Sequence, residues 1–149
     1  MREYAGITGF PSLPPLWSLG YQQSHRTIED RDEMLRVAKT FREKQLPCDV
    51  LIYLGTGFCP SGWNTGHDSF AFNPKVFPNP QQDIGALQAL KFRVVLHTTR
   101  PPARLYGTVA GPRDLSGENA AAAYWARHQP VSKLGLDGWW PDEAQNRPE

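Results

Sequence analysis

The residues best suited to chemistry lie in the last apolar segment, Leu136-Asp137-Gly138-Trp139-Trp140-Pro141-Asp142-Glu143. Indole rings can cover the C–H faces of a sugar, and a carboxylate can meet the positive charge that develops at a reacting anomeric carbon. Alternation along a strand puts Trp140 on the same side as Asp142, and Trp139 on the opposite side. The segment therefore indicates a carbohydrate site with Asp142 at its centre. The alternative is a buried aromatic strand followed by an acidic helix cap, with Trp140 in the core.

A polar and aromatic loop is the second candidate. Residues 57–68 read GFCPSGWNTGHD, in which Trp63 could stack on a sugar while Asn64 or His67 could bond to its hydroxyl groups. The alternative is an Ω-loop packed by its own side chains. His25 and Arg26 follow the first apolar segment and could reach the same site, although an arginine there could equally pair with neighbouring loops.

Other chemistries lack their signatures. The four histidines and two cysteines show no zinc-type spacing, no glycine-rich phosphate loop follows a strand, and no Ser-His-Asp arrangement is evident, so we expect neither metal nor cofactor. A formal charge of +1 gives no basic footprint for nucleic acid. The chain contains no apolar stretch of membrane-spanning length and its first residues lack a signal-peptide core, so no membrane segment is expected and the compartment stays open.

Hydrophobic patterning predicts how these residues are positioned. A near-continuous apolar run such as residues 50–54 is typical of a strand covered on both faces. A capping-box pattern at Thr27 and Asp30 predicts a helix to about Lys44, and Asn79-Pro80 opens a second helix. Strands are predicted at 17–21, 50–54, 92–98 and 136–140, and the third helix at 118–128.

This alternation of about four strands with three helices predicts an α/β fold with a parallel sheet. In such folds the carboxyl ends of the strands carry the functional groups, which places Asp142 on the active face. Asp137 begins its strand and is expected at the opposite end, as a turn residue. A complete (β/α)8 barrel needs about 250 residues, more than the 149 present.

Several motifs, taken in order, resemble those of glycoside hydrolase family 31, the α-glucosidases and α-xylosidases. Ile7-Thr8-Gly9 and the segment Leu13 to Arg26 are similar to the first barrel strand and the loop after it. Pro47-Cys48-Asp49-Val50 resembles the second strand. Phe70 to Pro80 resembles the Phe-x-Phe…Phe-Pro-x-Pro run that follows, and Asp137 to Asp142 the strand that bears the nucleophile.

The resemblance implies a retaining α-glycoside hydrolase in which Asp142 is the nucleophile and Trp140 helps to wall the sugar subsite. It implies that residues 1–149 are a fragment of one TIM-barrel catalytic domain, a partial (β/α)8 barrel truncated at both ends. The general acid would come from a later strand, so the remainder of the barrel or another chain is needed to complete the site. The alternative is a non-catalytic carbohydrate-binding or structural remnant of such a barrel.

Three further expectations concern single residues. Leu54 stands where family α-glucosidases usually have an aspartate that holds sugar hydroxyls, so xylose or another sugar is an alternative to glucose. Glu143 follows Asp142 directly and should point away from it. Cys48 and Cys59 flank a strand that separates its ends by about 20 Å, far beyond the reach of a disulfide, so we expect two free thiols.

Overall fold

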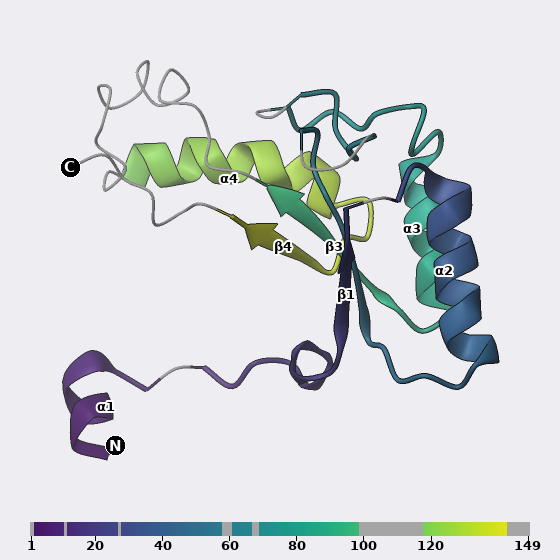
Figure 1. The fold of residues 1–149 in the computed structure, drawn as a ribbon. Helices are drawn as coiled ribbons and strands as arrows, with labels where there is room; N and C mark the ends of the chain where they lie inside the picture. Colours follow the sequence, from purple (N-terminus) through teal and green to yellow (C-terminus); the bar gives the residue numbers. More distant parts are fainter. Residues whose placement is uncertain are drawn as a thin grey trace.

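The computed structural model describes residues 2–10, 12–26, 28–57, 61–66, 69–98 and 118–142. In chain order its elements are α1 (Arg2–Thr8), the 3-10 helix η1 (Leu16–Leu19), β1 (Gln22–His25), α2 (Arg31–Glu43), β2 (Val50–Tyr53), α3 (Pro80–Ala89), β3 (Arg93–Thr98), α4 (Glu118–Ser132) and β4 (Gly138–Pro141). The strands form one sheet in the order β1-β2-β3-β4, and every pairing is parallel (Figure 1). The predicted class, four parallel strands alternating with three helices, is confirmed.

The register divides the side chains of the sheet between two faces. Tyr53 pairs with Leu96, and Leu96 pairs with Trp139, so these three form one row across the sheet. They belong to the hydrophobic cluster shared with the helices. The next row carries His97 opposite Trp140, and alternation directs that row to the other face. In a β/α barrel this second face lines the interior.

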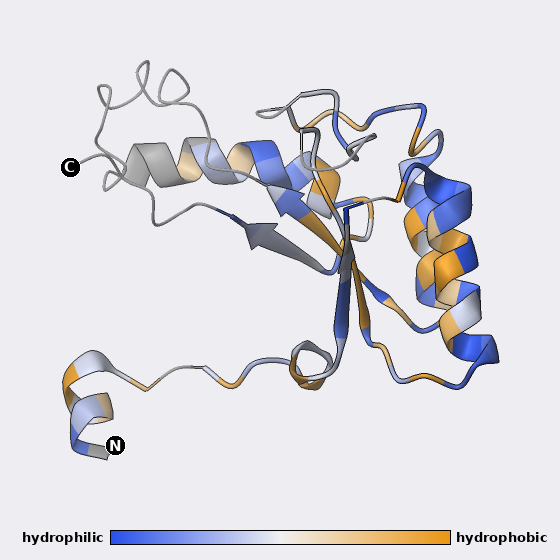
Figure 2. Ribbon diagram, viewed as in Figure 1, coloured by the Kyte–Doolittle hydropathy of each residue, from blue (hydrophilic) through white to orange (hydrophobic). Residues whose placement is uncertain are grey.

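The first strand is not where the sequence predicted it. Residues 16–19 form η1 after Pro14-Pro15, and β1 is the polar segment 22–25 that follows. An edge strand does not need the apolar run of a central one, and Figure 2 shows β1 as hydrophilic beside the hydrophobic β2. Trp17 packs instead beneath β4, where a Cβ on Gly138 would lie 3.7 Å from its Cη2. Ile7 and Thr8, expected in a strand, belong to α1.

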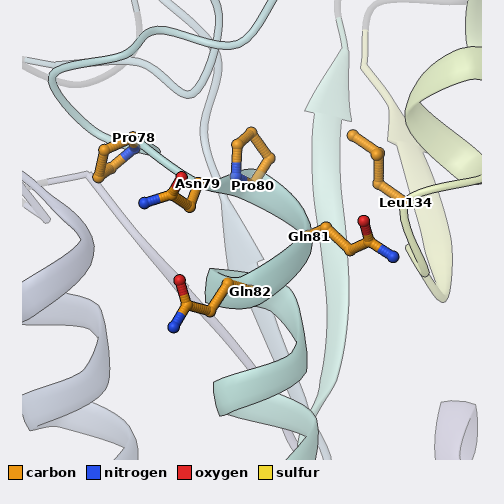
Figure 3. Close-up of a pocket in the computed structure, with 6 residues that line it drawn as sticks. All are labelled: Pro78, Asn79, Pro80, Gln81, Gln82 and Leu134. Carbon is orange, nitrogen blue, oxygen red and sulfur yellow. The ribbon is translucent and has the colours of Figure 1, made fainter.

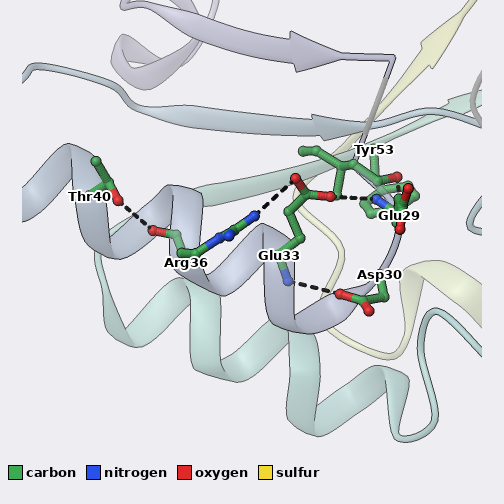
Figure 4. Close-up of polar contacts among 7 residues, drawn as sticks. Glu29, Asp30, Glu33, Arg36, Thr40 and Tyr53 are labelled. Carbon is green, nitrogen blue, oxygen red and sulfur yellow. Dashed lines mark hydrogen bonds and ion pairs between the residues drawn. The ribbon is translucent and has the colours of Figure 1, made fainter.

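The start of α2 shows a cap three residues later than predicted. Asp30, not Thr27, is the N-cap, and its Oδ1 accepts a hydrogen bond from the Glu33 amide at 2.8 Å. Glu33 in turn accepts one from the Glu29 amide at 2.7 Å (Figure 4). Glutamate is the stronger reciprocal partner in such a cap, which explains why this pair prevails. Thr27 lies outside the described residues.

The helices α2 and α3 lie side by side (Figure 1). Pro80 opens α3 as predicted, but the Asn79 side chain makes no capping bond. Asp83 does so instead: its Oδ2 accepts from the Asn79 amide at 3.2 Å, and its other oxygen pairs with Arg31 of α2. At the far end of α2, Arg42 donates to the carbonyl of Leu90 at 2.7 Å. Both ends of the helix pair are therefore fixed by charge-assisted bonds.

The last helix is longer than the sequence indicated. Helix α4 continues past His128 to Ser132 with Pro130 inside its final turn, where the missing N–H costs one intrahelical bond close to the end. The strand β4 then begins at Gly138, two residues later than expected. Across the described part of the chain, no helix is long and apolar enough to span a membrane.

Candidate active site

The carboxyl ends of β2, β3 and β4 bring the candidate residues together. The amide of Asp142 donates to the carbonyl of Thr98 at 2.8 Å, which ties the residue after β4 to the end of β3. Gly55, just after β2, approaches His97 of β3. Parallel pairing aligns these ends on one edge of the sheet, so three separate chain segments converge there.

His97 is the contact between these segments. Its Nε2 atom lies 3.3 Å from Oδ2 of Asp142, while its Nδ1 accepts the Gly55 N–H at 3.2 Å. The imidazole is 1% exposed, whereas the Asp142 side chain is 36% exposed. The Asp142 carboxylate thus contacts a buried imidazole through one oxygen, and part of its surface is exposed to solvent. From the sequence, His97 was counted only among the four histidines that lack zinc-type spacing; its place at the end of a buried strand was the available signal.

Trp140 borders the same pair. Its ring lies 5.0 Å from the His97 ring in an edge-on arrangement, and 39% of its surface is exposed. Trp140 and Asp142 are two residues apart across the end of β4, on one side of the strand. An exposed aromatic face beside a carboxylate is the arrangement expected of a sugar subsite.

Trp63 has a different place from the one its loop suggested. It is fully buried, and its Nε1 donates to the carbonyl of His97 at 2.8 Å. Asn64 is also buried and holds the Thr56 amide at 2.8 Å. Neither side chain is exposed to a sugar, so both serve packing rather than direct binding, and the bond to His97 shows that Trp63 packs on β3 as well as on its own segment. The Trp63 ring packs against Phe70 and Phe72, which follow residues 57–68 in the chain, and against Trp139 of β4.

The same loop holds its shape through a close backbone approach. A Cβ on Gly62 would lie 2.0 Å from the Thr56 amide nitrogen, so the position admits only glycine. Asn64 forms an antiparallel bridge with Phe72, and the Trp63 amide donates to the Leu54 carbonyl at 3.1 Å. The described part of the loop is therefore a firm support beneath the carboxyl end of β2.

Trp139 packs toward the helices, as alternation predicted. Its Nε1 donates to the Ser132 hydroxyl at 3.0 Å, and its ring contacts His128 at 4.7 Å. His128 is buried among aromatic rings, and this burial lowers the pKa of its imidazole. These residues join α4 to the sheet and stand on the face opposite Asp142.

Asp137 occupies the amino end of β4 and is saturated with hydrogen bonds. Its Oδ1 pairs with Arg93 at 2.8 Å, and its Oδ2 accepts from the Val94 amide at 3.0 Å and from Gln88 at 2.8 Å. The predicted role as a turn residue away from the active face agrees with these contacts.

Of the remaining residues that the sequence singled out, some lie outside the description and others are buried. His25 ends β1, but its side chain lies outside the description, as do His67, Glu143 and Cys59. Leu54 is buried and offers no polar group at the end of β2. Cys48 is a free, buried thiol, as expected. Among the described residues, no three acidic, histidine or cysteine side chains gather where they could hold a metal ion.

A surface pocket of about 580 Å³ lies elsewhere, at the start of α3. It is lined by Pro78, Asn79, Pro80, Gln81, Gln82 and Leu134 (Figure 3). Its polar groups are exposed amides, with no carboxylate or histidine among them. The convergence of Asp142, His97 and Trp140 is therefore the better candidate for chemistry.

A four-stranded parallel β/α sheet, with a carboxylate and an aromatic ring at its carboxyl edge, is the arrangement of part of a β/α barrel. Comparison with known proteins gives the family. Residues 11–110 match the model of the glycosyl hydrolases family 31 TIM-barrel domain. The chain belongs to glycoside hydrolase family 31.

Relatives with established names agree with this family assignment. The chain is 39% identical over 95 residues to alpha-glucosidase 2 of Bacillus thermoamyloliquefaciens, covering 64% of this chain and 11% of that protein. It is 29% identical over 158 residues to the alpha-xylosidase of Saccharolobus solfataricus, covering 97% and 21%. The chain thus spans about a tenth to a fifth of the length of these relatives. The fold matches a family 31 alpha-xylosidase from a soil metagenome, solved with xylose, at a TM-score of 0.81 and 18% identity, covering 98% of this chain and 25% of that one.

Proposed function

We propose that this chain forms the nucleophile-bearing part of a retaining α-glycoside hydrolase, with Asp142 as the nucleophile. The observation that carries the proposal is the position of Asp142: directly after β4, beside the end of β3, and 36% exposed next to Trp140. The family of the chain and the names of its relatives support a carbohydrate substrate.

The chemistry needs two carboxyl groups. The nucleophile attacks the anomeric carbon and forms a glycosyl ester, which water then cleaves, while a second carboxyl group about 5–5.5 Å away protonates the leaving oxygen. Asp137 cannot supply that proton, because five residues of strand separate it from Asp142 by about 16 Å. We propose that the acid comes from a later part of a complete barrel, of which residues 1–149 are one portion.

The proposed substrate is an α-glucoside or an α-xyloside. Relatives of both names are similar to this chain. Leu54 bears on the choice, because its buried aliphatic side chain cannot hold a sugar hydroxyl. Comparing kcat/KM for 4-nitrophenyl α-xyloside and α-glucoside, with the protein expressed from the complete reading frame, decides between them.

A mechanism-based fluoro-sugar tests the nucleophile. A 5-fluoro-α-glycosyl fluoride traps the glycosyl ester, and peptide mass spectrometry locates it. We expect the label on Asp142, and none in Asp142→Asn. The matched control is Asp137→Asn, which should still be labelled at position 142. A label on Glu143, or on any other residue, would show that the assignment is wrong.

A further inference from the structure

His97 is a buried polar residue that contacts the proposed nucleophile directly. Its surface is 1% exposed, and its Nε2 lies 3.3 Å from Oδ2 of Asp142. Burying an imidazole costs free energy unless its nitrogens find partners. Both ring nitrogens of His97 have them, one from the main chain and one from Asp142.

The main-chain partner decides which nitrogen carries the proton. A backbone amide can only donate, so the Gly55 N–H at 3.2 Å makes Nδ1 an acceptor. In the neutral ring the proton then resides on Nε2. The Nε2–H group faces Oδ2 of Asp142, and a histidine in this tautomer donates to the carboxylate.

The ring has little freedom to turn away. The carbonyl of His97 accepts the Trp63 indole N–H at 2.8 Å, which anchors its backbone to the loop after β2. The Trp140 ring stands edge-on at 5.0 Å. A Cβ on Gly55 would lie 3.3 Å from the His97 carbonyl oxygen and 3.5 Å from Nδ1, so the absence of a side chain permits this approach.

We propose that His97 is a positioning residue for Asp142, holding Oδ2 through Nε2–H so that Oδ1 is directed at the anomeric carbon. This inference rests on the proposed function of Asp142. As Oδ1 bonds to the anomeric carbon, the bond to the leaving group breaks and the leaving group takes its electron pair. A fluoride leaves as the ion and needs no proton, and the His97 proton stays on Nε2 throughout.

Two amide replacements, each of which reproduces the position of one ring nitrogen, separate this role from a merely structural one. In His97→Asn the amide oxygen reaches the Nδ1 position and can still accept from Gly55, but residue 97 no longer donates to Asp142. In His97→Gln the amide nitrogen reaches the Nε2 position and restores that donor. His128→Asn is the matched control, because it alters a buried histidine on the opposite face of the sheet.

The experiment measures the labelling rate at saturation (kinact) and the half-saturating concentration (KI) of 5-fluoro-α-xylosyl fluoride and its glucosyl counterpart. It uses the protein from the complete reading frame. For His97→Asn we expect kinact to fall by about 10- to 100-fold with KI within about threefold, since misdirecting a reacting group by about 1 Å can cost 10²-fold. His97→Gln and His128→Asn should stay within about threefold of the original protein.

The outcomes distinguish the two proposals. If neither sugar labels Asp142 in the original protein, the proposed function has failed. If Asp142 is labelled and His97→Asn reacts at the original rate, or His97→Gln is as slow as His97→Asn, the positioning role alone is overturned. Should the His97 variants not fold, Gly55→Ala decides: it keeps the imidazole, but its Cβ would lie 3.3 Å from the His97 carbonyl oxygen, so the backbone that carries the ring must shift by a few tenths of an ångström. A kinact unchanged in Gly55→Ala overturns the proposal, and a fall of about threefold or more supports it.

Discussion

Asp137 and Asp142 stand at the two ends of β4, and their carboxylates have different surroundings. Asp137 is 10% exposed and binds the Arg93 guanidinium, the Val94 amide and the Gln88 side chain. Asp142 is 36% exposed and contacts an imidazole that is itself fixed from behind. The first carboxylate joins β4 to β3 and α3, whereas the second is presented at a surface.

The difference follows from where each end of the sheet lies. At the amino ends of the strands, Asp137 closes the turn that leads from α4 into β4, and its partners come from neighbouring elements of the same domain. At the carboxyl ends of the strands of a β/α barrel, the loops form the active face. The same residue type therefore serves packing at one end and, by our proposal, chemistry at the other.

The largest expected effect is on activity at the carboxyl end. Replacing Asp142 by Asn keeps the shape of the side chain but removes the charge that attacks the anomeric carbon. We expect kcat of the protein from the complete reading frame to fall by about 10⁴-fold or more, with its melting temperature changed little. Hydrolysis of an aryl α-glycoside measures the first, and circular dichroism the second.

The opposite end provides the control for that experiment. Asp137→Asn should retain kcat within about threefold, because the residue lies about 16 Å from the reacting carbon by strand length. If Asp137→Asn lost activity while remaining folded, the contrast between the two ends would be wrong.

The second effect is on the free energy of unfolding, for which Asp137 should matter more than Asp142. Asp137→Ala removes an ion pair and the acceptor of a buried amide, so we expect a loss of about 2–3 kcal/mol in the free energy of unfolding. Asp142→Ala should cost less, because the Asp142 carboxylate is 36% exposed and its removal lets water reach the Nε2–H of His97. Urea titrations of the chain followed by tryptophan fluorescence compare them. Equal losses would contradict the proposed division of roles.

How far the sequence predicts the fold depends on burial. The strands β2 and β3 are covered on both faces, so their apolar runs are visible in the sequence. The edge strand β1 is polar and carries no such signal, and the prediction fell on the neighbouring η1. The cap of α2 was predicted three residues early because Thr27-x-x-Asp30 and Asp30-x-x-Glu33 both fit the capping pattern, and the structure has Asp30 as the N-cap.

The candidate site shows the same limit. Alternation along β4 was sufficient to put Trp140 and Asp142 on one side of the strand. The burial of Trp63 depends on aromatic neighbours that come from separate elements, such as Trp139. His97 could not be identified from spacing either, since its partners Gly55 and Asp142 are 42 and 45 residues away. Contacts between segments that lie far apart in the sequence can be predicted only when the register of the sheet is known.

A third prediction concerns Cys48, next to the amino end of β2. Burial raises the pKa of this thiol, and its Sγ donates to the Val50 carbonyl at 3.4 Å. Because the thiolate is the reactive form, we expect alkylation by iodoacetamide at pH 8 to be at least about tenfold slower in the folded chain than in urea. Peptide mass spectrometry follows this cysteine alone. Equal rates would mean that the amino end of the sheet opens readily.

The smallest expected effect concerns His128, on the helix side of β4. Burial among aromatic rings lowers the pKa of its imidazole below the usual value near 6.5, so the folded chain holds it neutral. As the pH falls below that usual value, the unfolded chain takes up the proton first, and unfolding becomes more favourable by up to about 1.4 kcal/mol for each pH unit. The stability that the chain has with His128 neutral is therefore fully present above the usual pKa. It is lost as the pH falls from that value toward the lowered pKa. His128→Gln removes it, so urea titrations at pH 7.5 and pH 5.5 should show a smaller loss of stability in the variant than in the original chain. Other groups titrate in both proteins and cancel in the difference, so equal losses would show that His128 is solvated and that this side of β4 is not closed.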